Sequence, residues 1–323
     1  MPRNPDLPRP FETVVSKADL LAELKSVDCS DEARGRILAM ETAFRQRISS
    51  HVAALPAKSS SFQRFNTSPF VLVFYAKQKG YRYVSEIESD ILPAKLFSSM
   101  ETSAGRMVQD VVLPLYGWEG VESTMHSASS VLDGRKCESG IVKLATLKSE
   151  PRCLNDEMSK DLADDIVGHA EQWAEEAGVD HVDFTYGVLY GTKKQSNKKD
   201  WHILRNIVET RGTRFVIQHP RKRWDCSFRV RGVRVDVAVR IGTEWWAHLG
   251  GSHTLMETMC ALIRACVTPA SSAEKGAAYT ISDLGEIISI EGVPDDYNVS
   301  LLQRSQIQWL FFLARHYCDR IEE

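Results

Sequence analysis

The stretch from Ser129 to Glu157 constrains the fold of this chain more than any other. A short β-prone run ends at Asp133, a polar Cys-Glu-Ser-Gly turn follows, and a second β-prone run extends over Ile141–Lys148. Two such runs joined by a polar turn predict a β-hairpin. Because side chains alternate along a strand, Thr146 and Lys148 are expected on one face. Pairing of the two strands would then bring Asp133 close to Lys148.

An acid and a lysine that meet on neighbouring strands are the arrangement of metal-dependent nucleases. The carboxylate holds Mg²⁺, and the lysine acts on the attacking water or on the phosphate. The spacing alone favours an ordinary surface hairpin that ends in a lysine, because such hairpins are common. The pattern therefore names two candidate residues, Asp133 and Lys148, without deciding what they do.

Asp133 and the segment LATLK at Leu144–Lys148 resemble the catalytic motif of the PD-(D/E)xK superfamily of type II restriction endonucleases. Thr146 stands where the second acid of that motif is usual. Four further segments resemble, in the same order, parts of one subgroup, the Eco-O-one-oh-nine-I group. These segments are Gly105–Pro114, Tyr186–Gly191, Trp201–Arg205 and Gly242–Trp246. The resemblance extends from Gly105 to about Leu262 and does not cover the first 60 residues.

The resemblance implies an α/β fold with a mixed central sheet flanked by helices, and sequence-specific cleavage of double-stranded DNA with Mg²⁺. Asp133 would bind the metal, Lys148 would orient or activate water, and Thr146 would assist only through its hydroxyl or backbone. A helix acid before the hairpin often helps to hold metal in this superfamily, so Asp110 is a second candidate ligand. A two-fold symmetric homodimer is expected, because a palindromic site offers one strand to each subunit.

The distribution of charge also points to nucleic acid. The chain has a net charge of −3, yet residues 191–240 hold 14 Lys and Arg against four acids, so this segment is +10 and the remainder −13. Clustered Lys and Arg neutralise phosphates. We therefore expect DNA contacts from a basic loop, from the segment Trp201–Arg205 that follows it, from the cluster Arg221–Trp224, and from an arginine-bearing ribbon. The candidates are Lys193, Lys194, Lys198, Lys199, Arg205, Arg221, Arg223, Arg231 and Arg234.

The ribbon is predicted from strict alternation. Between Val233 and Ile241, one face carries only apolar residues and the other carries Arg234, Asp236, Ala238 and Arg240. Such a ribbon suits a DNA groove, since Arg can bond guanine in bidentate fashion. Ordinary exposure on the surface of a sheet would produce the same pattern.

The rest of the chain divides into a helical N-terminal arm, residues 1–60, suited to dimerisation or to packing on the core, and a catalytic and DNA-binding core, residues 61–323. Capping residues and apolar stripes predict several helices. The predicted helices are Ser16–Lys25, Ser30–Leu55, Ser103–Leu113, Asn155–Ala177, Ser252–Val267 and Ser300–Ile321, and Phe70–Tyr75 is either a strand or part of a helix. His181–Tyr190 is expected beside the hairpin as a strand. The Trp245–Trp246 pair favours core packing over stacking on bases.

Composition narrows the functional class. Seven cysteines without a C-x-x-C pair argue against a disulfide framework and a zinc site. The sequence has no run of 18 apolar residues, and no apolar signal region follows the charges at the N-terminus. A cytoplasmic protein is therefore expected. Two alternatives stay open beside the restriction enzyme. One is a structure-selective repair or recombination nuclease of the same superfamily, and the other is a DNA-binding module that has lost catalysis.

Overall fold

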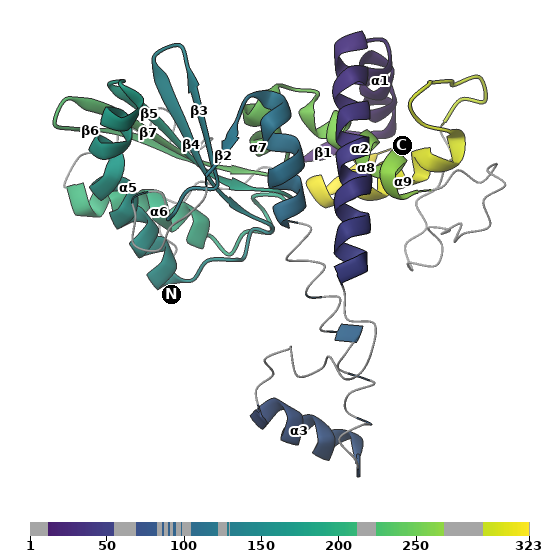
Figure 1. Ribbon diagram of the computed structural model, residues 1–323, viewed down its shortest axis with the longest axis horizontal. Helices are drawn as coiled ribbons and strands as arrows, with labels where there is room; N and C mark the ends of the chain where they lie inside the picture. Colours follow the sequence, from purple (N-terminus) through teal and green to yellow (C-terminus); the bar gives the residue numbers. More distant parts are fainter. Residues whose placement is uncertain are drawn as a thin grey trace.

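A computed structural model describes residues 12–54, 69–82, 105–121, 130–211, 224–267 and 293–322, with a few single positions between 86 and 128. Within these residues, a mixed sheet of six strands is flanked by helices, and a helical unit packs beside it (Figure 1). The fold is therefore α/β with a mixed central sheet, as the sequence predicts.

The sheet combines antiparallel hairpins at both edges with parallel strands in the middle. In chain order its strands are β2 (Glu119–Gly120), β3 (Gly134–Glu138), β4 (Ile141–Lys148), β5 (His181–Val188), β6 (Asp225–Val230) and β7 (Val233–Ile241). In space the order is β2-β3-β4-β5-β7-β6. The pairs β4–β5 and β5–β7 are parallel, whereas β2–β3, β3–β4 and β6–β7 are antiparallel.

The predicted hairpin is present as β3 and β4. Its two-residue turn, Ser139 and Gly140, has φ values of 53° and 76°. Positive φ at both positions matches the twist of the flanking strands, which is why such turns are common in tight hairpins. One detail of the prediction is wrong: Asp133 does not end a strand but directly precedes β3, so the acid lies where the chain enters the hairpin.

The connection from β4 to β5 is the long helix α5 (Asp156–Ala177). The side chain of Asn155 accepts a hydrogen bond from the backbone N–H of Met158 and so caps the first turn. Gly178 ends the helix in the left-handed conformation, with φ 65°. Both predicted ends are confirmed, and the crossover lets β5 lie parallel to β4.

One face of the sheet is covered by α5 and by α6 (Lys199–Arg211). Apolar side chains of β4, β5 and β7 form a continuous core with these helices. In β7 the predicted alternation is confirmed, because Val233, Val235, Val237, Val239 and Ile241 are buried. The opposite face carries the polar residues of β7 and is covered near the carboxyl ends of the strands by α7 (Thr243–Gly250). Trp245 and Trp246, both in α7, are core residues, as predicted.

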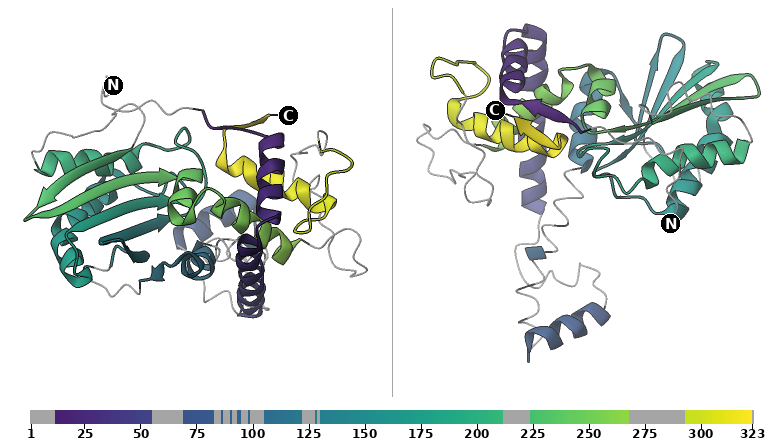
Figure 2. Two further views of the ribbon diagram at one scale, coloured as in Figure 1. Left: turned by 90° about the horizontal axis from the view of Figure 1, so that it is seen from above. Right: turned by 180° about the vertical axis from the view of Figure 1, so that it is seen from behind.

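The N-terminal segment joins the C-terminal helices in one unit beside the sheet (Figures 1 and 2). Its elements are α1 (Lys17–Asp28), α2 (Asp31–Ala54), α8 (Thr254–Cys266) and α9 (Arg304–Ala314). Ser16 and Ser30 cap α1 and α2 through hydrogen bonds from Asp19 N–H and Ala33 N–H. The segment Phe70–Tyr75 lies in a helix, α3 (Pro69–Lys79), so of the two alternatives the helix is observed.

The predicted long final helix is wrong beyond Ala314. A 3-10 turn, η4 (Arg315–Tyr317), follows α9, and β8 (Arg320–Glu322) then pairs in parallel with β1 (Val14–Ser16). Asp319 explains the change: its carboxylate accepts bonds from Thr13 N–H at 2.8 Å and from the Thr192 hydroxyl at 2.8 Å. These long-range bonds compete with continued helix and tie both ends of the described chain to the loop after β5.

The sheet and the helical unit are joined by a buried ion pair. Glu257 in α8 is 1% exposed, and its carboxylate accepts two bonds from Arg36 in α2, both at 2.7 Å. The hydroxyl of Tyr116, in the 3-10 turn η2 (Leu113–Tyr116), donates to the same carboxylate at 2.6 Å. Because η2 leads into β2, this cluster fixes one edge of the sheet against the helices.

Gly250 makes this junction sensitive to a single methyl group. A Cβ at Gly250 would lie 2.0 Å from Cδ1 of Tyr116, whose hydroxyl is already held by Glu257. We expect Gly250→Ala to lower the free energy of unfolding by about 1–3 kcal/mol, as overpacking does in a well-packed core. The control is Gly35→Ala in α2, where nothing lies within 4 Å and alanine should stabilise the helix. Urea unfolding of both variants measures the difference, and equal stabilities would contradict the expected clash.

Among the described residues, no helix combines the length and apolar character needed to cross a bilayer.

Candidate active site

Asp133 lies where the chain enters β3 and is held against β4 by hydrogen bonds. Its backbone N–H donates to the carbonyl of Ala145 at 2.8 Å, and its Oδ2 accepts from the N–H of Leu147 at 2.6 Å. Burial raises the pKa of Asp133, and the Leu147 N–H and the charge of Lys148 each lower it. No hydrogen bond is found for Oδ1 among the described residues. One oxygen of the carboxylate is thus anchored, and the other is available to a ligand.

Lys148 is the last residue of β4. Its charge acts on the pKa of Asp133, although no ion pair within 4 Å is found for it in the described part of the chain. The strand end is held by a backbone bond from Leu189 N–H to the Lys148 carbonyl at 2.8 Å. The structure therefore brings the two predicted residues together on a fixed backbone without a direct contact between them.

Thr146 is buried, with 6% of its surface exposed. Its hydroxyl donates to the carbonyl of Val131, two residues before Asp133. A hydroxyl used in this way has no second proton to donate. Thr146 therefore contacts the segment that carries Asp133.

Asp110 lies in the helix at residues 105–112, and its carboxylate pairs with Arg47 of α2 at 3.2 Å. Asp110 is exposed, and it is not among the groups that shift the pKa of Asp133. The same helix does approach the hairpin, because a Cβ at Gly105 would lie 3.1 Å from the hydroxyl of Ser149. The helix thus borders the site, whereas its acid faces α2.

The entry of the hairpin offers a divalent cation one carboxylate, that of Asp133. Mg²⁺ keeps several waters and is commonly bound through one or two carboxylates together with substrate phosphates. Asp133 supplies one carboxylate with an unengaged oxygen. No group of three or more His, Cys, Asp or Glu residues able to hold a metal is found within the described ranges. The residues present fit a cation that is completed by substrate oxygens, and they do not fit a closed structural metal site.

Most of the predicted DNA-contacting residues are paired with acids of this chain. Six of the nine form an ion pair with a neighbouring carboxylate. The pairs are Lys193–Glu244 at 2.7 Å, Lys194–Glu12 at 3.2 Å, Lys199–Asp156 at 2.5 Å, Arg205–Glu209 at 2.7 Å, Arg231–Glu171 at 2.9 Å and Arg234–Asp236 at 2.9 Å. Surface pairs of this kind contribute about 0–1 kcal/mol each, so a phosphate can displace the acid at small cost.

Lys198 differs from these six. It is exposed, with φ at 69°, and no side-chain ion pair is found for it in the part of the chain that the structure describes. Its backbone N–H bonds to the hydroxyl of Ser196 at 2.8 Å, which fixes the loop just before α6. Arg221 and Arg223 lie outside the described residues. Lys198 is thus the predicted contact that is best placed to meet a phosphate without breaking an ion pair.

Two carboxyls with raised pKa values, buried Asp200 and half-buried Asp183, are not among the site residues that the sequence predicts. Asp200, at the start of α6, is 0% exposed, accepts a bond from the Ser196 hydroxyl at 2.7 Å and faces Tyr186 of β5. Asp183 in β5 lies on the polar face, and burial raises its pKa. The alternation of Asp183 with apolar neighbours in the sequence indicates a strand residue on the polar face. The burial of Asp200, by contrast, depends on how two loops pack.

Burial raises the pKa of Asp200 to about 6, so its charge costs stability at neutral pH. The folded protein holds this proton more tightly than the unfolded chain does, and stability therefore falls as pH rises from about 4 to about 6. Asp200→Asn should raise the free energy of unfolding at pH 7 by up to roughly 3 kcal/mol and leave it unchanged near pH 4. Urea unfolding at both pH values tests this, with the exposed Asp180→Asn as control. A gain of the same size at both pH values would contradict the assignment.

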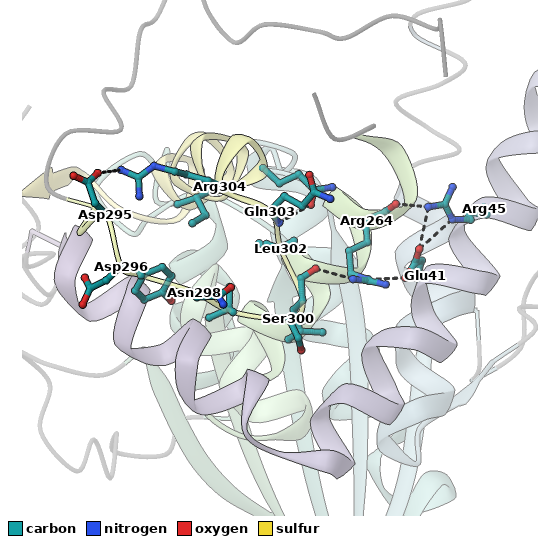
Figure 3. Close-up of a pocket in the computed structure, with 15 residues that line it drawn as sticks. Glu41, Arg45, Arg264, Asp295, Asp296, Asn298, Ser300, Leu302, Gln303 and Arg304 are labelled. Carbon is teal, nitrogen blue, oxygen red and sulfur yellow. Dashed lines mark hydrogen bonds and ion pairs between the residues drawn. The ribbon is translucent and has the colours of Figure 1, made fainter. Parts of the chain in front are cut away.

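Two cavities are lined by residues other than Asp133 and Lys148. The larger, about 720 Å³, lies between α2, α8 and the segment before α9 (Figure 3). Its charges neutralise one another: Glu41 accepts from both Arg45 and Arg264, and Arg304 pairs with Asp295 (Figure 3). Because these charges are already paired with one another, the cavity is a structural junction between α2, α8 and the segment before α9.

The smaller cavity, about 220 Å³, lies on the polar face of the sheet. Asp236 is bound there to His181 at 2.7 Å and to Ser227 at 2.5 Å, in addition to Arg234. Asp183 and Arg240 line the same cavity, and Nε of Arg240 is buried without a hydrogen-bond partner among the described residues. Asp183 and Asp236 lie in the amino-terminal halves of β5 and β7, whereas Arg240 lies near the carboxyl end of β7 and Lys148 ends β4.

No protein-family model matches this sequence, and no curated protein matches it either.

Proposed function

We propose that this protein is a Mg²⁺-dependent, sequence-specific endonuclease of double-stranded DNA, of the restriction type, with a restriction-endonuclease-like core. The observation that carries the proposal is the geometry at the entry of the hairpin. There, an anchored carboxylate with one unengaged oxygen, Asp133, lies within the electrostatic reach of Lys148. The resemblance of the flanking segments to type II restriction endonucleases supports the same class.

Asp133 and Lys148 have distinct parts in the proposed reaction. Asp133 would hold the cation through its Oδ1, while the N–H of Leu147 fixes Oδ2. When bound, Mg²⁺ polarises the scissile phosphate and lowers the pKa of the attacking water. Lys148 donates to the water or to the phosphate oxygens, where negative charge increases in the transition state.

The DNA would run beside the loop after β5 and the start of α6. Lys193, Lys194, Lys198 and Lys199 all lie there. The loop follows β5, which is the strand paired with β4, so the basic residues and Lys148 come from neighbouring strand ends. Two subunits related by a two-fold axis would each cut one strand of a symmetric site.

The test uses purified protein with Mg²⁺ on long unmethylated phage DNA and on a branched DNA of the same length. Discrete fragments from the phage DNA, with no preference for the branch, are the expected result. Cleavage confined to the branch would indicate a structure-selective repair or recombination nuclease instead. Degradation without discrete fragments would contradict sequence-specific cutting.

A DNA-binding protein without catalysis is the second candidate. It is favoured by Thr146, which stands where an acid is usual and whose hydroxyl donates to the carbonyl of Val131. Binding of the phage DNA without cleavage at any Mg²⁺ concentration would support this candidate and reject the endonuclease.

Lys198 provides a test of the DNA surface that does not depend on cleavage. Lys198→Ala should weaken binding to all sequences about equally and reduce the slope of log K against log salt by about one phosphate contact. The control is Arg34→Ala, an exposed position in α2. Binding is measured by fluorescence anisotropy at several salt concentrations, without Mg²⁺. A slope unchanged by Lys198→Ala would remove this loop from the DNA interface.

A further inference from the structure

Three consecutive residues of β4 hold the segment that carries Asp133. Ala145 accepts from the N–H of Asp133 at 2.8 Å, the hydroxyl of Thr146 donates to the carbonyl of Val131, and the N–H of Leu147 donates to Oδ2 of Asp133 at 2.6 Å. Two of these bonds come from the backbone and would form with most residues in β4. The bond from Thr146 is the one of the three that depends on a side chain of β4.

The surroundings of Thr146 leave it little scope to act as a metal ligand. It is 6% exposed, and its register partner in β5, Tyr186, is 0% exposed and lies on the same face. The proton of its hydroxyl is directed at Val131. A cation beside Thr146 would therefore have to displace a formed hydrogen bond in a packed site.

We propose that Thr146 is a positioning residue, which fixes the segment 131–133 through its bond to Val131. In this arrangement Asp133 holds the cation and Thr146 does not. This inference rests on the proposed function. It also gives a reason for threonine at the acid position: a carboxylate there has no proton to donate, so it would repel the Val131 carbonyl and release the segment that carries Asp133.

Three substitutions separate positioning from metal binding. Thr146→Ser keeps the donor and should behave like the wild type. Thr146→Val keeps the shape and removes the donor, so the Mg²⁺ concentration for half-maximal cleavage should rise about five-fold, the value of one net hydrogen bond. Thr146→Asp should lose cleavage. A lower Mg²⁺ requirement in Thr146→Asp, or an unchanged requirement in Thr146→Val, would overturn the proposal.

The matched control is Thr185→Val in β5. Thr185 is buried like Thr146, with 0% of its surface exposed, and its hydroxyl contacts Nε2 of His248 at 3.3 Å, on the other face of the sheet. Its loss should lower stability without changing the Mg²⁺ requirement, and this distinguishes a local effect on Asp133 from general destabilisation. An equal change of the Mg²⁺ requirement in both valine variants would overturn the positioning role.

A second measurement keeps the inference separate from the proposed function. Hydrogen exchange of the Leu147 amide, followed by NMR in the metal-free protein, should be about five-fold faster in Thr146→Val than in the wild type, and unchanged in Thr146→Ser. Equal exchange in all three proteins would reject positioning whether or not the protein cleaves DNA. Faster exchange in Thr146→Val, together with a wild type that never cleaves DNA, would keep the positioning role of Thr146 and reject the endonuclease.

Discussion

Replacing Lys148 by alanine should reduce the rate of DNA cleavage by about 10²–10³-fold, the usual effect of removing one preorganised donor from a developing negative charge. The change removes the ammonium group and leaves the strand, because β4 is held by backbone bonds on both sides. DNA binding should persist, since the basic loop after β5 is untouched. Single-turnover cleavage and fluorescence anisotropy, measured on the same preparation, separate the two effects.

The control for this experiment is Lys143→Ala. Lys143 lies in the same strand, pairs with Glu138 at 2.6 Å and is on the opposite face from Lys148. Its removal changes the charge equally but should leave the cleavage rate within about two-fold of the wild type, as expected of a surface substitution remote from the site. Full activity in Lys148→Ala would remove this residue from the mechanism.

Asp133→Asn should abolish cleavage and at the same time stabilise the protein at neutral pH. The amide loses the charge that holds a cation, whereas the buried carboxylate that it replaces carries a desolvation cost, as the raised pKa of Asp133 shows. Since the folded state binds this proton more tightly than the unfolded state, the cost grows as pH rises through the acid range. Thermal unfolding at pH 7 and at pH 3 should show a gain for the variant only at pH 7.

Asp183→Asn is the matched control for Asp133→Asn. Burial also raises the pKa of Asp183, which lies in β5 on the polar face, so its replacement should give a pH-dependent gain in stability of the same sign. Cleavage should remain, because Asp183 lies away from Lys148. A loss of cleavage in both variants would show that the effect of Asp133→Asn is not specific to the hairpin.

Local sequence signals were sufficient for most of the elements. The capping residues Ser16, Ser30 and Asn155 each accept the hydrogen bond that was predicted for a helix start. The alternation in β7 predicted the buried face correctly, because consecutive side chains in a strand point to opposite faces. The final helix was predicted too long, because the bonds of Asp319 to residues far away in the sequence redirect the chain after α9.

The part of the site that lies within one hairpin was predictable, because local pairing of consecutive residues determines it. Asp133 and Lys148 are related by one hairpin, so their proximity follows from strand pairing over 15 residues. The ion pairs of the basic residues depend on acids from other elements, such as Glu244 in α7 for Lys193, and sequence spacing carries no information on these. The bond from Thr146 to Val131 was equally hidden, because it depends on the path of the chain before β3.

The most direct measurement is the position of the bound cation. In NMR spectra of the protein titrated with Mn²⁺, a paramagnetic ion broadens signals only from nearby nuclei, and the amides of Leu147 and Lys148 should broaden first. Asp133→Asn should remove this broadening. Selective broadening at Asp183 and Asp236 instead, with the Leu147 signal unaffected, would place the cation on the polar face of the sheet and contradict a metal site at the hairpin.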